Sequence, residues 1–241
     1  MSGRPSPRLV LSCEHASHAV PAHLRERFGD DRMQALLASH RGYDLGALAL
    51  ARRLARALEA PLFAGTVTRL VVDLNRSPTN PRVFGAPVRD LDARERAALL
   101  RRYHAPHWAR VGAHVARVIE AGDLALHVAV HSFTPRLDGH VRRTQIGLLY
   151  DPARPLERAL CARWKRRLEA VAPHLRVRRN DPYEGRADGL PTALRRVHPA
   201  DRYVGVELEV NQALLMGPTD ARAAVSDALR ATLAAVMTPT P

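Results

Sequence analysis

Two histidines stand where apolar segments of the sequence give way to polar ones. His15 follows the apolar residues 9–11 almost directly, and His131 ends the segment 127–131. Neutral imidazole is the commonest metal ligand in proteins, and neighbouring strands of a sheet lie about 5 Å apart. If both segments are strands of one sheet, the two imidazoles can bind the same metal ion. A lone strand-end histidine is more often a packing residue, so the prediction rests on the pair.

A third polar group, Asp-Leu-Asn-Arg, occupies residues 73–76 and follows the apolar residues 70–72. Asn75 and Arg76 can hydrogen-bond a carboxylate, the arginine through a bidentate, charge-assisted fork. Arg69 begins the same segment and can either join them in binding substrate or pair with a structural acid. This group predicts a site for an acidic substrate.

Near the C-terminus, residues 204–211 alternate strictly between apolar and other types. Glu207, Glu209 and Asn211 therefore share one face of a predicted strand. Burial raises the pKa of a carboxyl group and a nearby cation lowers it, so a glutamate on this face can be tuned to move protons. The same alternation also fits an edge strand whose polar face is in water.

The elements that must position these residues follow an α/β pattern, in which short apolar segments alternate with longer helical ones. The predicted strands are residues 8–13, 69–74, 127–131, 144–150, 175–178 and 203–210. The predicted helices are residues 45–58, 91–120 with a break near Pro106, 155–170 and 219–236. Asp92 and Thr219 are candidate helix caps, and Pro155 suits a first helical turn. Turn-rich loops are expected at residues 78–87, 134–143 and 180–192.

Length and composition favour an ordinary globular enzyme. The chain has 241 residues, of which 46% are apolar, and we expect one domain over residues 1–241 with its core at about 8–237. The formal net charge is +13, but the basic residues are spread along the whole chain and aromatic residues are few, which argues against a nucleic-acid partner. Cys13 and Cys161 lie far apart, so neither a disulfide framework nor a cysteine zinc site is expected.

The sequence contains neither a signal peptide nor an apolar run of about 18 residues, so a cytoplasmic protein with no membrane partner is expected. Its oligomeric state is left open.

Seven blocks, in order along residues 8–215, resemble the N-formylglutamate amidohydrolase family. They are SCEHAS at 12–17, YDLGA at 43–47, RLVVDLNR at 69–76, YH at 103–104, HSFTP at 131–135, NDPY at 180–183 and ELEV at 207–210. The resemblance implies a three-layer α/β/α fold with a mixed, mostly parallel central sheet. That fold is phosphorylase/hydrolase-like, as in zinc carboxypeptidases and aspartoacylase-like deacylases. It also implies metal-dependent hydrolysis of an N-formyl or related N-acyl amide on an acidic amino acid such as glutamate.

The resemblance also suggests a metal-ligand set. Asp44 belongs to a matched block and completes, with His15 and His131, the common set of two histidines and one carboxylate for Zn²⁺. Manganese or iron fits the same ligands. The wider relatives carry His-x-x-Glu, but this chain has His18 at the glutamate position. Glu14 and His18 therefore remain alternatives for the third ligand, and Asp44 can equally cap the helix that follows it.

The remaining roles concern proton transfer and substrate binding. Glu209 aligns with the family's strand glutamate and is expected to be the general base, with Glu207 as its alternative, acting on metal-activated water. Asn180 and Tyr183 are expected on a loop that closes over the substrate, and His104 either stabilises an oxyanion or orients a ligand. The alternatives are a zinc carboxypeptidase or deacylase with another N-acyl or peptide substrate, and a non-enzymatic module that binds polyanions.

Overall fold

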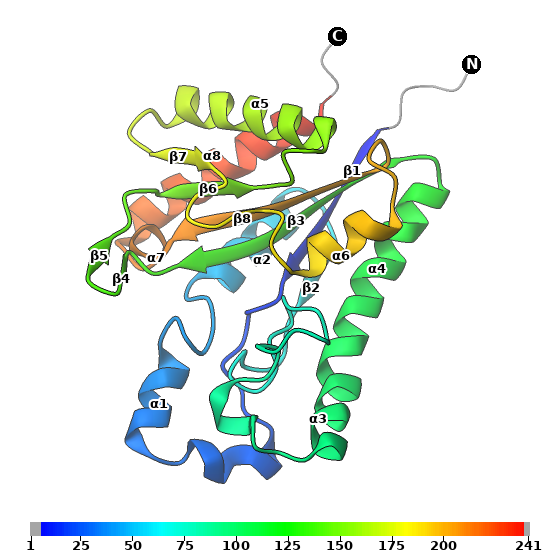
Figure 1. The fold of residues 1–241 in the computed structure, drawn as a ribbon. Helices are drawn as coiled ribbons and strands as arrows, with labels where there is room; N and C mark the ends of the chain where they lie inside the picture. The colour runs from blue at the N-terminus through cyan, green and yellow to red at the C-terminus, as the bar shows by residue number, and fades with distance from the viewer. Residues whose placement is uncertain (1–5, 239–241) are drawn as a thin grey trace.

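The computed structural model describes residues 6–238, which form a six-stranded sheet with helices on both faces (Figure 1). The strand order is β2-β1-β3-β8-β6-β7. The strands are β1 (Pro7–Cys13), β2 (Leu62–Ala64), β3 (Leu124–Phe133), β6 (Ile146–Leu149), β7 (Val177–Arg179) and β8 (Tyr203–Asn211). The first four in that order run parallel, and β6, which pairs antiparallel with β8, carries β7 parallel to itself. The expected mixed, mostly parallel sheet is therefore confirmed.

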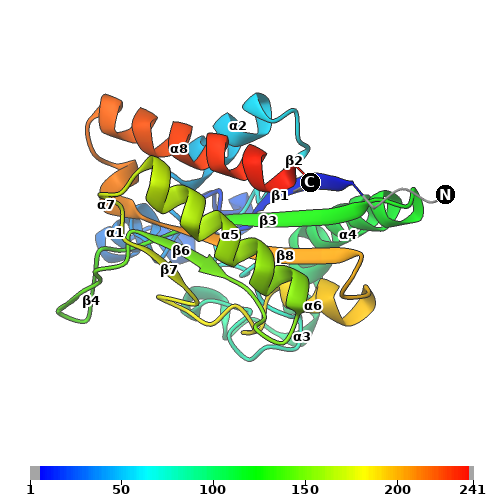
Figure 2. The same ribbon diagram turned by 90° about the horizontal axis from the view of Figure 1, so that it is seen from above.

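Helices cover both faces of this sheet and make three layers (Figure 2). On one face lie α2 (Ala47–Ala57), α5 (Pro155–Val171) and α8 (Thr219–Met237), and on the other lie α4 (Ala105–Glu120) and α6 (Leu190–Val197). The central strands are almost wholly apolar because both of their faces are buried. Leu11 and Val128 pack with Trp164 of α5 on the first face, whereas Val10 packs with Val111 of α4 on the second.

A second apolar cluster lies beside the sheet, in the lower part of Figure 1. It is formed by the 3₁₀ helix Ala22–Phe28, α1 (Asp31–Ala38), α3 (Ala93–Leu99) and the loop that follows β2. The strand predicted at residues 69–74 does not form, because these residues belong to this loop. Val71 and Val72 are buried in the second cluster, and both of their backbone N–H groups donate to the Thr68 carbonyl in a turn. The segment is apolar because it fills this cluster.

Other differences from the predicted elements are local. The predicted helix 91–120 is interrupted by a π-helical turn, Leu100–His104, directly before Pro106 in the first turn of α4. Asp92 caps α3 through a capping box with Glu95, and Pro155 opens α5, but Thr219 caps nothing because the N-cap residue of α8 is Pro218.

Besides α1 and the 3₁₀ helix at residues 22–28, several short elements were not predicted from the sequence. They are β2, the hairpin of β4 (Arg136–Leu137) and β5 (His140–Val141), the start of α6, and α7 (Gln212–Leu215). Within residues 6–238, no helix is long and apolar enough to cross a membrane.

Candidate metal centre and active site

The candidate site lies where the parallel strands β1, β3 and β8 end, as is usual for open α/β sheets. His15 lies two residues beyond β1, and His131 of β3 is paired in register with Glu209 of β8. A cavity of about 220 Å³ opens there. Of the residues singled out in the sequence, its lining includes His15, Asp44, Arg69, Asn75, Arg76, His131, Tyr183, Glu207 and Glu209.

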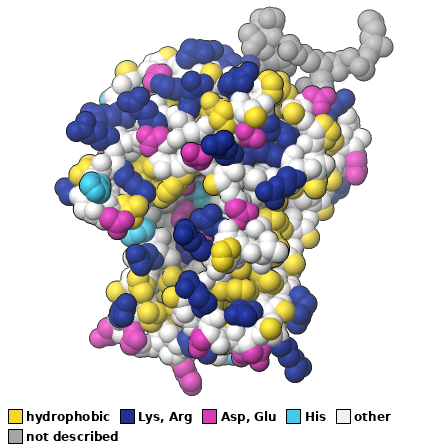
Figure 3. All heavy atoms as spheres, viewed as in Figure 1, with side chains coloured by type: hydrophobic (Ala, Val, Ile, Leu, Met, Phe, Trp, Pro, Cys, Tyr) yellow, Lys and Arg dark blue, Asp and Glu magenta, His cyan; other side chains and the backbone are white. Residues whose placement is uncertain are grey.

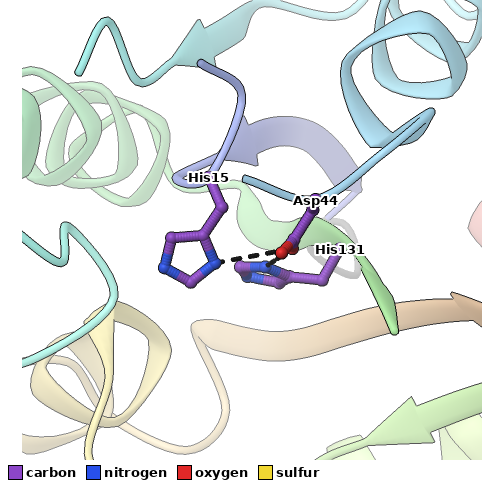
Figure 4. Close-up of side chains that lie close together, drawn as sticks. All are labelled: His15, Asp44 and His131. Carbon is purple, nitrogen blue, oxygen red and sulfur yellow. Dashed lines mark hydrogen bonds and ion pairs between the residues drawn. The ribbon is translucent and has the colours of Figure 1, made fainter. Parts of the chain in front are cut away.

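Three buried side chains of this cavity lining, His15, Asp44 and His131, lie close together (Figure 4). One donor atom of each lies within 4.8 Å of the other two. The Asp44 Oδ2 atom is 2.9 Å from Nδ1 of His131 and 3.4 Å from Nδ1 of His15. The His15 Nδ1 atom has no hydrogen-bond partner among the described residues. Two imidazole nitrogens, one of them unpartnered, and a carboxylate oxygen form a donor set that fits a zinc-like cation.

Asp44 reaches this cluster from the loop between α1 and α2. Gly46 is the N-cap residue of α2 and no side chain caps that helix, so Asp44 does not have the capping role that the sequence left open. Its Oδ2 atom also accepts a hydrogen bond from the backbone N–H of Ser132. The carboxylate is thus directed at the two histidines.

Each histidine of the cluster has a buried carboxylate at its other ring nitrogen. The His15 Nε2 atom donates to Oδ1 of Asp73 at 2.6 Å, and Nε2 of His131 lies 3.1 Å from Oε2 of Glu14. Both Nδ1 atoms are thereby left to face Asp44. Such outer carboxylates fix the ring orientation of metal-binding histidines and raise their basicity.

The two alternative ligands lie outside the cluster. Glu14 is fully buried behind His131 and also contacts His107 of α4, whose Nε2 atom is 3.5 Å from Oε1. His18 is exposed, and its ring packs at a tilt against that of Tyr43, with the ring centres 4.9 Å apart. Neither belongs to the group of donor atoms formed by His15, Asp44 and His131. The geometry therefore favours Asp44.

The charges of the cluster are strongly coupled. Burial would lower the pKa of His131, but hydrogen bonds to Asp44 and Glu14 outweigh it and raise that pKa well above its usual range. Burial and the Arg69 guanidinium lower the pKa of His15, yet Asp73 and Asp44 give it a net increase. The pKa of Asp44 lies well below its usual range, because the two histidines overcome the effect of burial. Without a cation the cluster is held by ionic hydrogen bonds, and a cation would displace its protons.

Glu209 has the opposite electrostatic environment. Burial, with the negative charges of Asp44 and Glu207 adding to it, raises its pKa to about 8, although His131 opposes the shift. Its Oε2 atom has no hydrogen-bond partner among the described residues. Glu209 is thus a carboxyl group in the cavity wall that can both accept and release a proton near neutral pH. Glu207, two residues earlier on the same face, accepts a hydrogen bond from Nδ2 of Asn75.

The residues expected to bind a substrate carboxylate differ in how many contacts they already make with other residues of the protein. Arg69 pairs with Asp73 at 3.0 Å and with Asp44 at 3.5 Å, so it holds two site carboxylates in place. Asn75 uses both ends of its amide, donating to Glu207 and accepting from the backbone N–H of Leu190. Arg76 makes one hydrogen bond to a backbone carbonyl, and its nearest carboxylate oxygen is 3.9 Å away. Of the three, Arg76 is the most available to substrate.

His104 and Asn180 do not line the cavity. The His104 Nε2 atom donates to the carbonyl of Arg76 at 2.7 Å, and its ring packs on Trp108. The Asn180 Oδ1 atom accepts from the backbone N–H groups of Tyr150 and Gly185. His104 therefore positions the main chain at Arg76 and Asn180 shapes its own loop, so direct contact with substrate is not assigned to either.

Several residues of the site were given no role from the sequence. Asp73 belongs to the Asp-Leu-Asn-Arg block, and this position could have identified it. His107 lies one helical turn after His104, a spacing that could also have identified it. No pattern in the sequence pointed to Asp188. Its Oδ2 atom accepts hydrogen bonds from the backbone and hydroxyl of Ser77 and from Asn80, and so joins the two loops that border the cavity.

The surface around the site is mixed in charge. Figure 3 shows basic side chains scattered over this face and also gathered beside a central hollow, in which acidic and histidine side chains are visible. An acidic substrate would therefore meet cations at the entrance and carboxylates deeper inside.

Comparisons with known proteins agree with this architecture. The model of the N-formylglutamate amidohydrolase family matches residues 7–216. A gene product from Agrobacterium tumefaciens with a known crystal structure is 31% identical, with a TM-score of 0.79 over 97% of this chain and 91% of that one. The N-formylglutamate amidohydrolase from Ralstonia eutropha JMP134 is 21% identical, with a TM-score of 0.66 over 97% of this chain and 94% of that one, which shows a shared fold. A search of curated proteins finds no match.

Proposed function

The chain belongs to the N-formylglutamate amidohydrolase family, and from this premise we propose that it hydrolyses the N-formyl amide of an acidic amino acid such as N-formylglutamate, with the help of a metal ion. One observation carries the proposal. A single cavity brings the cluster of His15, Asp44 and His131 together with Glu209, a carboxyl group whose pKa burial raises to about 8.

The metal, by this proposal Zn²⁺ or a similar divalent ion, is held by His15, Asp44 and His131. The unpartnered Nδ1 atom of His15 and the two outer carboxylates, Asp73 and Glu14, support this choice. Bound there, such an ion supplies the positive charge that makes water acidic and polarises a carbonyl group.

Glu209 moves the proton in this proposal. Its position in the cavity wall, in register with His131, places it beside the cluster at which the amide is cleaved. It takes a proton from the attacking water and returns it to the leaving amine, a role for which a pKa near the working pH is favourable.

Arg76 binds the α-carboxylate of the substrate through its guanidinium fork. His104 donates a hydrogen bond to the backbone carbonyl of Arg76, and so fixes the main chain from which this side chain extends. Asn75 contributes by holding Glu207, and Arg69 by holding Asp44 and Asp73. Tyr183, which lines the cavity and is half exposed, forms part of the wall beside the substrate by this proposal.

The test is hydrolysis of N-formyl-L-glutamate by purified protein, followed as release of L-glutamate, with the metal content measured on the same sample. We expect chelation to abolish activity and zinc to restore it. His131→Ala should lose both metal and rate, whereas Glu209→Gln should keep the metal and lose about 10²- to 10⁴-fold in kcat. His18→Ala, an exposed histidine near the site, is the matched control and should keep both.

Two results would refute the proposal: full activity after complete metal removal, or full metal occupancy in His131→Ala. Parallel assays with N-acetyl-glutamate and with a peptide ending in glutamate separate a deformylase from a deacylase or a carboxypeptidase that shares the same residues.

A further inference from the structure

Arg142 lies against Tyr183, a residue that lines the cavity, and takes no part in the roles assigned so far. It directly follows β5, whose hairpin with β4 projects beyond the end of β3 (Figure 1). Its Nη1 atom donates to the hydroxyl of Tyr183, a cavity-lining residue, at 2.8 Å. Its guanidinium lies 5.0 Å from the ring centre of Tyr183 and 5.6 Å from that of Phe133. Two aromatic rings thus hold this cation beside the cavity.

The backbone of Arg142 is also held at both of its polar groups. Its N–H donates to the carbonyl of Pro135, and its carbonyl accepts from the side chain of Asn211 at the end of β8. A planar guanidinium on a fixed backbone loses little conformational freedom when it binds an anion. Arg142 is in this sense preorganised.

No carboxylate within residues 6–238 forms an ion pair with Arg142. By contrast, Arg69 of the same cavity pairs with two acids, and Arg76 lies 3.9 Å from one. Arg142 is thus a guanidinium beside the cavity whose charge no acid of the described residues compensates, so it is available to an anion from outside the chain. Arg142 also helps to lower the pKa of His40, after burial and the charges of Arg41 and Arg69, whereas Asp44 raises it.

The spacing along β3 indicates which anion fits. Phe133, on which Arg142 packs, lies two residues after His131 and on the same face of the strand, a rise of about 7 Å. In an extended glutamyl group the side-chain carboxyl carbon is four bonds from the amide nitrogen, or about 5 Å. The side-chain carboxylate of a glutamyl amide cleaved beside His131 is therefore long enough to extend towards Phe133, on which Arg142 packs.

We propose that Arg142, stacked between Phe133 and Tyr183, binds the side-chain carboxylate of an acidic N-acyl amino acid and so selects glutamyl substrates. The inference rests on the proposed function for the cleaved bond, and adds to it the recognition of the second negative charge. Arg76 and Arg142 then bind one carboxylate each.

The experiment compares N-formyl-L-glutamate with its uncharged isostere, N-formyl-L-glutamine, on the metal-loaded protein. We expect Arg142→Gln to lower kcat/KM for the glutamate substrate roughly 10- to 100-fold and to leave that for the glutamine substrate within about twofold. Arg142→Lys, which keeps the charge but not the planar stacking, should retain part of the preference. Arg143→Gln removes an exposed neighbouring arginine with no ion pair among the described residues, and should behave as the unchanged protein.

A second measurement does not depend on turnover. Calorimetry with L-glutamate and L-glutamine, which are not hydrolysed, should show tighter binding of glutamate to the unchanged protein and to Arg143→Gln, and no preference in Arg142→Gln. Equal affinities in the unchanged protein, or a preference that survives in Arg142→Gln, would overturn the inference even if both formyl substrates are cleaved. Failure to cleave either formyl compound would refute the proposed function, while the binding comparison would still decide the role of Arg142.

Discussion

At the scale of single residues, the candidate metal cluster depends on carboxylates that do not face the cavity. Asp73 and Glu14 each occupy the outer nitrogen of one histidine, and Arg69 bridges Asp73 and Asp44 from the cavity side. These contacts decide which ring nitrogen each histidine presents to a cation. The orientation of the donors is therefore set before any ion arrives.

Replacing Asp73 by asparagine tests this arrangement. Asparagine has a similar shape but lacks the negative charge that makes the His15 ring more basic, so we expect zinc affinity to fall about 10- to 100-fold. Competition with a chromophoric chelator measures the affinity directly. Asp227→Asn, which changes an exposed aspartate paired with Arg53, should leave it unchanged. Equal zinc affinity in Asp73→Asn and the unchanged protein would mean that Asp73 has no influence on the cluster.

Single residues also show where inference from the sequence ends. His127 and His131 lie on the same face of the same strand, yet His127 is hydrogen-bonded to Ser12 and Tyr203 inside the core. Burial lowers its pKa to about 4, so it is a neutral packing residue. The sequence could select His131 because it is followed by Ser132 and belongs to a family block. It could not reveal the carboxylate behind each histidine, because those pairs join residues 58 and 117 positions apart.

At the scale of elements, periodicity predicted the strands that carry the site and failed for the loop that completes it. The alternation in β8 correctly placed Glu207 and Glu209 on one face, because a strand in a sheet repeats every two residues. The apolar residues 70–72 suggested a strand, but they fill the second apolar cluster from a loop. A short apolar run shows that a segment is buried, but the elements against which it packs decide whether it forms a strand.

The loop that carries Tyr183 and Asp188 is tied to the core by a buried ion pair. Arg195 of α6 donates from Nε to both oxygens of Glu157 in α5, and its other nitrogens donate to the carbonyls of Gly185 and Gly205. Glu157 is fully buried. One arginine thus links two helices, the strand β8 and the cavity loop.

We expect Arg195→Met to destabilise the protein by about 3–5 kcal/mol, because it removes both hydrogen bonds of Arg195 to the buried Glu157 carboxylate and leaves it only Arg154, 3.5 Å away. At roughly 2–4 °C per kcal/mol for a chain of this size, the melting temperature should fall by about 6–20 °C. Arg196→Met, on the exposed side of the same helix, is the matched control and should change it little. A melting temperature for Arg195→Met within a degree or two of the control would show that this pair does not hold the loop.

At the scale of the whole molecule, the site is assembled from segments between residues 14 and 209, so its stability and that of the fold are coupled. The layers could be predicted because each strand and helix has a local pattern. The convergence of β1, β3 and β8 with two long loops could not, since it depends on strand order and on loops that pack against one another. The family resemblance supplied that long-range information where periodicity could not.

This coupling predicts how the stability of the metal-free protein depends on pH. Glu209, with its pKa raised to about 8, stays protonated in the folded protein at pH values at which it is ionised in the unfolded chain. Its contribution to the free energy of unfolding therefore falls as pH rises from about 4.5 to 8. The pKa values of His15 and His131 are also raised, so their contribution is full below about 6.5 and is lost as pH rises through the folded values. Asp44 and Asp73, with lowered pKa values, contribute throughout this window and lose it only in strong acid.

The metal-free protein should therefore melt at a lower temperature at pH 9 than at pH 6. Saturating zinc should narrow or reverse that difference, because zinc binds deprotonated histidines and its affinity rises with pH. Thermal melts at both values, with and without zinc, measure both effects. Glu209→Gln removes one of the titrating groups, so its metal-free melting temperature should vary less with pH than that of the unchanged protein. Two outcomes would contradict the charges assigned to this cluster. One is a metal-free protein whose melting temperature is higher at pH 9 than at pH 6, and the other is a zinc-induced rise in melting temperature that is smaller at pH 9 than at pH 6.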